Sequence, residues 1–271
     1  MMQKSMPVLA LAAGAMAAGS SCPSNSPLSC HNTTAVADTC CFIPTGQLLQ
    51  TQFWDTSPPT GPSDWTLMFI SLFSLIKDSW TIHGLWPDNC DGSYPAQCDA
   101  DRAYTNLTAI LQANGADDTL DYMDRYWKDY KGDDESFWEH EWGKHGTCIS
   151  TLEPSCYGDA YRDGEEAADF FTRTVGLFKT LPTYQWLADA GIEPSDSQTY
   201  DAAQIQSVLA KQHGAQVTLG CKNGVFNEVW YHFNVRGSLQ DGEFVAAAPD
   251  GAKSKCKGNV RYTPKSGSDD L

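Results

Sequence analysis

Hydrophobic and polar positions along the chain follow strand and helix periodicities in separate regions. Short apolar or alternating runs predict strands at residues 47–54, 79–85, 215–221 and 226–235. Apolar residues at helical spacing predict helices at residues 103–112, 119–127, 137–146, 165–180 and 201–212. Strands at both ends with helices between them favour an α+β fold, a single domain in which helices flank an antiparallel sheet.

Turn residues set two of the expected strand boundaries. Pro87 is expected to end the strand at residues 79–85, because proline lacks the N–H that a strand pair needs. Lys222-Asn223-Gly224 is typical of a hairpin turn and joins the last two predicted strands.

One apolar segment fits neither periodicity. Residues 65–76 (WTLMFISLFSLI) are almost continuously apolar. The run is too short for a membrane-spanning helix and lacks the alternation of a half-buried strand. It follows a Pro/Gly/Ser-rich loop at residues 57–64 and precedes the strand that contains His83.

The N-terminus has the features of a secretory signal peptide. Lys4 supplies a positive charge, residues 6–13 are apolar, and Ala15-Met16-Ala17 is a small-x-small cleavage pattern. We expect residues 1–17 to be removed and the mature protein to be secreted, with a vacuolar destination as the other outcome. A buried N-terminal helix is the alternative interpretation.

The polar tail, residues 265–271, is expected to be disordered.

The cysteines agree with an exported protein. All ten follow the signal peptide, and an even number in an oxidising compartment predicts five disulfides. A zinc site is the alternative, but it needs closely spaced Cys or His ligands, and Cys40-Cys41 is the one adjacent cysteine pair in the sequence. The triplets that begin at Asn32 and Asn106 match the glycosylation pattern Asn-x-Thr.

The charge balance limits how this chain could bind nucleic acid. Its 34 acidic and 18 Lys and Arg residues give a formal net charge of −16. An acidic protein repels polyphosphate, so non-specific wrapping of nucleic acid is disfavoured. Any RNA chemistry must occur in a local cleft with its own cations, and low pH would assist it by neutralising carboxylates and charging histidines.

Two stretches combine histidine with carboxylate, lysine and tryptophan: WTIHGLWPDNC at residues 80–90 and FWEHEWGKHGTC at residues 137–148. On a helix, the second stretch would place His140, Glu141, Lys144 and His145 on one face. Paired histidines with a nearby cation can cleave a phosphodiester without a metal, because one imidazole accepts the 2′-hydroxyl proton and the other protonates the leaving 5′-oxygen. The 2′-hydroxyl nucleophile restricts this chemistry to RNA. Three histidines in the two stretches are candidates for this pair: His83, His140 and His145.

Other chemistries fit these residues less well. A zinc protease helix has histidines four residues apart, whereas His140 and His145 are five apart and Lys144 would repel the ion. The sequence has no G-x-S-x-G nucleophile motif, and we expect neither metal nor cofactor. Three further histidines are expected to be structural or simply exposed: His31, His213 and His232.

Both stretches resemble the two active-site segments of the ribonuclease T2 family. The similarity extends from about Cys22 to Tyr262, and the cysteine pattern is like that of the fungal branch. The resemblance implies one α+β domain over residues 18–264. It also implies an endoribonuclease that converts single-stranded RNA to 2′,3′-cyclic and then 3′-phosphate products, with little base preference and an acidic optimum. We expect a monomer that binds no membrane once the signal peptide is removed.

The resemblance also implies roles for individual residues. His83 would be the general acid and His145 the general base. Glu141 and Lys144 would stabilise the pentacovalent phosphorane, and His140 would bind the phosphate. The implied disulfides are Cys22–Cys41, Cys30–Cys90, Cys40–Cys156, Cys98–Cys148 and Cys221–Cys256.

Base binding follows the same resemblance. Three residues match the first base site of the family, namely Trp86, Asp88 and Tyr94, with the aromatic rings as stacking platforms. Core packing is the alternative role for Trp86. Gln52 and Phe137 match the second base site. The loop at residues 128–131 differs from some members, which leaves the preference at the second site open.

Family members pass almost directly from the loop at residues 61–64 to the strand at 79–83, so residues 65–78 are extra. Our hypothesis is that they are an unspliced intron translated in frame, and the alternative is a true insertion packed as an extra helix.

The rival function is a secreted RNA-binding or signalling protein that has lost catalysis on the same fold, although the presence of His83 and His145 argues against it.

Overall fold

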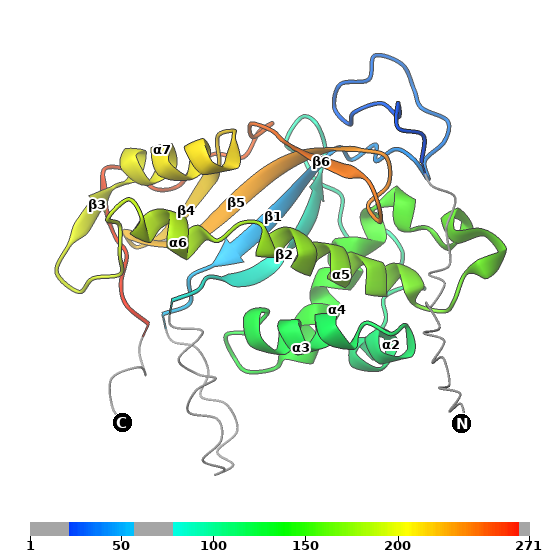
Figure 1. Cartoon of the computed structure of the whole chain (residues 1–271), viewed down its shortest axis with the longest axis horizontal. Helices are drawn as coiled ribbons and strands as arrows, with labels where there is room; N and C mark the ends of the chain where they lie inside the picture. The colour runs from blue at the N-terminus through cyan, green and yellow to red at the C-terminus, as the bar shows by residue number, and fades with distance from the viewer. Residues whose placement is uncertain (1–21, 57–77, 266–271) are drawn as a thin grey trace, which may run out of the picture.

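The computed structural model describes residues 22–56 and 78–265 (Figure 1). The predicted signal peptide, residues 65–77 of the apolar insert and residues 266–271 of the tail lie outside the described residues, and the predictions for them stay predictions. Lys265, predicted to belong to the tail, is instead buried, and its Nζ donates a hydrogen bond of 2.7 Å to the carbonyl oxygen of Ser79. The folded domain therefore extends at least to Lys265.

A single sheet organises the described part of the chain. Its strands are ordered β2-β1-β5-β7-β3, and β4 and β6 also pair with β5. All named pairs are antiparallel except β5 with β7, so the sheet is mixed rather than purely antiparallel. The strands are β1 (Gln47–Phe53), β2 (Thr81–Asp88), β3 (Thr199–Asp201), β4 (Thr218–Lys222), β5 (Val225–Arg236), β6 (Glu243–Ala246) and β7 (Asn259–Arg261).

Helices flank this sheet, as the α+β prediction requires. Figure 1 shows α6 and α7 near one end of the sheet, α2, α3 and α4 near the other, and α5 running between the two groups. The described α-helices are α2 (Leu107–Ala113), α3 (Asp117–Tyr126), α4 (Asp134–Lys144), α5 (Glu165–Lys179), α6 (Thr183–Ala188) and α7 (Ala202–His213). Short 3-10 helices follow α4 at Gly146–Cys148, Ser150–Leu152 and Pro154–Ala160. None of the helices in the described ranges is both long and apolar enough to cross a membrane.

The hydrophobic core has two parts. One packs α2 to α5 against β1 and β2, and the other packs α6 and α7 against β4 and β5. Along β5, Val229 and Tyr231 are buried in the second part. Because side chains alternate along a strand, Glu228 and Trp230 project from the opposite face of the sheet.

The prediction that Pro87 ends a strand is wrong. β2 continues to Asp88, and Pro87 pairs with Leu48 of β1. β2 lies at the edge of the sheet, where a missing N–H leaves no neighbouring strand unsatisfied. The predicted hairpin turn is present, with positive φ angles of 53° at Asn223 and 76° at Gly224.

Five disulfides are present, as predicted, and they join the pairs that the resemblance implies. Cys30–Cys90 ties the N-terminal segment to the loop after β2. Cys98–Cys148 ties the same loop region to the 3-10 turn directly after α4. The two segments that contain the catalytic candidates are therefore each cross-linked close to their ends. The other three bridges are Cys22–Cys41, Cys40–Cys156 and Cys221–Cys256.

Candidate active site

His83 is the extra residue of a β-bulge in β2. Thr51 pairs with Gly84 and Gln52 pairs with Ile82, so His83 has no partner of its own on β1. A bulge interrupts the two-residue alternation of a strand and redirects the side chains beside it. Here it lets His83 and Trp86, three residues apart, meet with ring centroids separated by 4.6 Å.

Helix α4 brings the second candidate segment to β2. The side chain of Asp133 caps the helix by accepting a hydrogen bond from the N–H of Ser136, which starts α4 three residues earlier than predicted. Trp138 and Trp142 are buried in the core and anchor the helix. His145 caps the C-terminal end, and its N–H donates to the carbonyl oxygen of Glu141 one turn earlier.

Glu141 contacts β2 directly because residue 84 is glycine. A Cβ at Gly84 would lie 1.9 Å from Oε2 of Glu141. That oxygen accepts a hydrogen bond of 2.8 Å from Nε1 of Trp86. The other oxygen, Oε1, lies 3.8 Å from Nε2 of His83. The fully buried carboxyl of Glu141 thus links the tryptophan to the first histidine.

Aromatic rings hold the two histidines in place. His145 stacks on Trp86 with 5.1 Å between ring centroids and an 18° interplanar angle. His83 meets the same indole edge-on and stacks on Phe53 with a centroid distance of 3.7 Å. Phe137 lies 5.9 Å from His83. Trp86 therefore contacts both candidate catalytic imidazoles.

The environment of His145 favours its neutral form. Burial, followed by the positive charge of Lys144 and the neighbouring His83 and His140, lowers the pKa of His145 to about 2. Neither ring nitrogen has a hydrogen-bond partner among the described residues. Both nitrogens are buried, so a bound substrate reaches them only where the surrounding side chains move. A neutral imidazole with unpaired nitrogens can then accept a proton.

His83 has a different environment. Burial lowers its pKa, and Lys144 and His140 act in the same direction, but a hydrogen bond to Glu228 and the charge of that carboxylate raise it. The distance from Nδ1 of His83 to Oε1 of Glu228 is 3.1 Å. Glu228 is not among the residues predicted from the sequence, where its signal is a single acidic residue in a largely apolar strand.

Burial also alters two carboxyls of the site. It raises the pKa of Glu141 to about 8, although the Trp86 hydrogen bond and Lys144 oppose the shift. It raises the pKa of Asp88, at the end of β2, to about 7. At acidic pH both are therefore neutral groups that can donate a hydrogen bond.

The base-binding candidates are not equally accessible. Tyr94 is 64% exposed, whereas Trp86, Asp88 and Phe137 are partly buried. Gln52 is fully buried: its Nε2 donates to the Leu181 carbonyl and to Gln50, and its Oε1 accepts from Thr183. A base contact by Gln52 would require this buried network to open.

The remaining candidate residues are placed as follows. His140 is exposed on α4, one turn before Lys144. His213 and His232 are buried, and a ring nitrogen of His213 hydrogen-bonds the carbonyl oxygen of His232 at 2.9 Å, which agrees with a structural role. Asn32 and Asn106 are exposed, as glycosylation would require.

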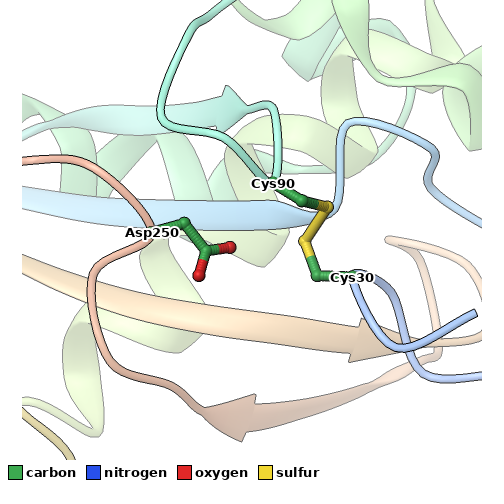
Figure 2. Close-up of side chains that lie close together, drawn as sticks. All are labelled: Cys30, Cys90 and Asp250. Carbon is green, nitrogen blue, oxygen red and sulfur yellow. A yellow bond between two sulfur atoms is a disulfide. The ribbon is translucent and has the colours of Figure 1, made fainter.

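One group of ligand-type side chains lies away from this site. Cys30, Cys90 and Asp250 lie close together, with their candidate ligand atoms within 4.8 Å of one another (Figure 2). The two sulfur atoms form a disulfide. Without thiolates, this group offers a metal only the Asp250 carboxylate, and it is not a metal site.

Residues 45–243 match the model of the ribonuclease T2 family. The chain belongs to the ribonuclease T2 family. It is 70% identical to Ribonuclease Trv of Hypocrea rufa over 248 residues, which covers 92% of this chain and 100% of that protein. It is 51% identical to Ribonuclease T2 of Aspergillus oryzae over 257 residues, covering 94% and 88% of the two chains.

Solved structures show the same fold. The crystal structure of Actibind, described as a T2 ribonuclease, superposes with a TM-score of 0.81 at 49% identity, covering 91% of this chain and 98% of that one. RNase NT in complex with 5′-AMP superposes with a TM-score of 0.58 at 20% identity, covering 81% of this chain and 98% of that one, which supports the fold alone.

Proposed function

We propose that this T2-family protein is a secreted endoribonuclease that cleaves single-stranded RNA without a metal. The observation that carries the proposal is that His83 and His145 both contact Trp86, with Glu141 hydrogen-bonded to the same indole and Lys144 directly before His145. Family membership supports the choice of RNA, because the relatives named above are ribonucleases.

The first step is a transphosphorylation. The neutral His145 imidazole takes the proton of the ribose 2′-hydroxyl while the 2′-oxygen forms a bond to phosphorus. The bond from phosphorus to the 5′-oxygen breaks, and that oxygen takes the Nε2 proton of protonated His83. The products are a 2′,3′-cyclic phosphate and a free 5′-hydroxyl.

Lys144, Glu141 and His140 act on the phosphoryl group. The Lys144 ammonium offsets the negative charge that develops on the non-bridging oxygens, and the neutral Glu141 carboxyl donates a hydrogen bond to one of them. His140 binds the phosphate. In the slower second step a water molecule attacks the cyclic phosphate and the two histidines exchange roles, which gives a 3′-phosphate.

An acidic optimum follows from these protonation states. His83 must be protonated to act as an acid, and burial lowers its pKa, so its charged form is favoured at low pH. Low pH also keeps Glu141 neutral and reduces the repulsion between RNA and a protein with a net charge of −16. His145 stays neutral throughout this range, since its pKa is about 2.

Base binding is proposed at the aromatic residues around the histidines. Trp86, Asp88 and Tyr94 form the first base site, with the neutral Asp88 carboxyl available to donate or accept a hydrogen bond. Phe137 forms the second base site, and Gln52 joins it only where its buried network opens. Stacking tolerates every base, so we expect little base preference. Secretion, glycosylation at Asn32 and Asn106, and a monomeric state complete the proposal.

The test uses the secreted protein with single-stranded RNA and with DNA of the same sequence at about pH 5, with and without EDTA. We expect cleavage of RNA only, unaffected by EDTA, with 2′,3′-cyclic phosphate ends identified by mass. Cleavage of DNA, or loss of activity in EDTA, would refute the mechanism. A folded protein that binds RNA without cleaving it would favour the non-catalytic alternative.

A further inference from the structure

The carboxylate of Glu228 contacts Nδ1 of the His83 ring. Its Oε1 lies 3.1 Å from Nδ1, and both side chains are 18% exposed. The other ring nitrogen, Nε2, faces Glu141 at 3.8 Å. We propose that Glu228 is a positioning residue for the general acid: it accepts the Nδ1–H of His83, so that Nε2 is the nitrogen that exchanges protons with RNA. This inference rests on the function proposed above.

Both residues of this pair lie on strands, His83 on β2 and Glu228 on β5, and neither lies on a flexible loop. In the pairing of β4 with β5, Gly220 opposes Glu228 and Cys221 opposes Phe226, so Asn227 is the extra residue of a second bulge. On the other side of β5, Glu228 pairs with Phe53, the residue whose ring stacks on His83. The bulge in β2 thus sets the direction of the His83 side chain, and the bulge in β5 lies directly before Glu228.

A glycine makes room for the carboxylate. A Cβ at Gly220 would lie 2.6 Å from Cβ of Glu228 and 2.8 Å from its Oε2. Any larger residue at position 220 would have to displace the Glu228 side chain. The close approach of β4 is therefore compatible with this carboxylate position because residue 220 has no side chain.

The charges around His83 show why a carboxylate is needed there. Helix α4 and its C-cap present His140, Lys144, Glu141 and His145 to the site. His140 and Lys144 lower the pKa of His83, and Glu141 is neutral below about pH 8. Of the described groups that act on His83, Glu228 is the one whose charge raises its pKa. It thereby opposes the effect of burial and keeps the acid protonated to a higher pH.

The same contact defines the state of His83 after proton transfer. When Nε2 gives its proton to the 5′-oxygen, the neutral ring keeps its remaining proton on Nδ1, bonded to Glu228. The ring need not turn, and the Nε2 lone pair already faces the site. In the second step it accepts a proton from the attacking water, which leaves His83 protonated as it began.

The first experiment does not depend on activity. In protein labelled with ¹⁵N-histidine, the ring nitrogen shifts of His83, assigned with a His83→Asn variant, show which nitrogen carries the proton in the neutral form. We expect the proton on Nδ1. A neutral His83 protonated on Nε2 would overturn the inference in the wild-type protein itself, without any substitution at Glu228.

The second experiment compares Glu228→Gln, which removes the charge and keeps the size, with Glu243→Gln on β6, an acid that pairs with Arg236 away from the site. In Glu228→Gln we expect the His83 pKa and the alkaline limb of kcat to move toward acid by about one pH unit or more. We also expect kcat to fall about tenfold or more, with KM within about threefold, since a positioned acid contributes roughly 10²–10⁴-fold.

The outcomes separate the inference from the function on which it rests. An unchanged His83 pKa in folded Glu228→Gln refutes the inference, whatever happens to the rate. If wild-type protein fails to cleave RNA while His83 carries its proton on Nδ1 and its pKa falls in Glu228→Gln, the proposed function is wrong and the His83–Glu228 pair stands. Glu243→Gln should match wild type in both measurements.

Discussion

The indole nitrogen of Trp86 donates a hydrogen bond of 2.8 Å to the carboxyl of Glu141. This bond joins β2 to α4 at the point where both candidate catalytic histidines contact the same indole. From the sequence, Trp86 is expected either to stack a base or to pack in the core. The structure shows that its N–H has a third role, because it supports a carboxyl that is 1% exposed.

Replacing Trp86 with Phe removes this hydrogen bond and keeps an aromatic ring, although a smaller one. Oε2 of Glu141 then loses its donor in a buried position, which costs about 1–3 kcal/mol when no replacement forms. We expect kcat for RNA cleavage to fall about tenfold while KM changes little. A large rise in KM with unchanged kcat would instead indicate that Trp86 acts mainly by stacking a base. Steady-state kinetics on a dinucleotide substrate decide between the two.

Replacing Gly84 with Ala tests the contact between β2 and α4. The new Cβ would lie 1.9 Å from Oε2 of Glu141 and 2.8 Å from Nε1 of Trp86, so the hydrogen-bonded pair must separate. We expect activity to fall by about 10²-fold or more, since small displacements of positioned groups have large effects on rate. The far-UV circular dichroism spectrum should stay that of the wild type.

The matched control is Gly176→Ala on α5. A Cβ at Gly176 meets no atom within 4 Å, and the residue is helical and exposed. Alanine is a better helix former than glycine by up to about 1 kcal/mol, so this variant should be slightly more stable and fully active. Equal activity of the two variants would show that the close approach at Gly84 is unimportant.

Replacing His145 with Ala tests the general base. We expect kcat to fall by about 10²–10⁴-fold, the range for a positioned acid or base, with the folded structure retained. Near-wild-type turnover in this variant would contradict the assignment. The comparison with His213→Ala is informative, because His213 is also buried but hydrogen-bonds only the backbone of β5. That variant should lose stability rather than kcat.

The sequence predicted the long elements and missed the short ones. Helices α3, α4, α5 and α7 have ten or more residues each, and their ends differ from the predictions by a few residues. The strands β3 and β7 have three residues each, and α6 has six, which is too short for a periodicity to be recognised. β2 was cut short because a proline reads as a strand end unless the strand is known to lie at a sheet edge.

The site was predictable where its residues are close in sequence. His140, Glu141, Lys144 and His145 lie within one helical turn and its cap, so their spacing alone groups them. Glu228 is 145 residues from His83. The two residues come close because β2 and β5 both pair with β1 in the folded sheet. The two bulges that orient this pair depend on strand register, which a single sequence does not reveal.

Deleting residues 65–78 tests the hypothesis that they are an unspliced intron translated in frame. Phe53 at the end of β1 pairs with Thr81 at the start of β2, so the two strands meet directly and a short connection suffices. A shorter loop costs slightly less entropy to close, about 0.6 kcal/mol for each halving. We expect the deletion variant to be active and at least as stable as the full chain by thermal unfolding. Loss of cooperative unfolding would favour a true insertion, as would a cDNA that contains the segment.

The buried carboxyl of Glu141 should make the protein less stable as the pH rises. Its pKa is about 8 in the folded protein against an ordinary value of 4.5. The folded state therefore binds the proton more tightly than the unfolded chain. This contribution is fully present below about pH 4.5 and is lost as the pH rises to about 8.

Glu141→Gln removes this titration and keeps the size of the side chain. One pKa unit corresponds to about 1.4 kcal/mol, so the variant should gain up to a few kcal/mol relative to wild type between pH 4.5 and pH 8. The exposed carboxyl at Glu193 gives a control, since Glu193→Gln should follow the wild-type curve. Urea unfolding at several pH values measures the difference. Parallel curves for Glu141→Gln and wild type would mean that Glu141 is charged in the folded protein, and it would then act on the phosphoryl group as an acceptor rather than a donor.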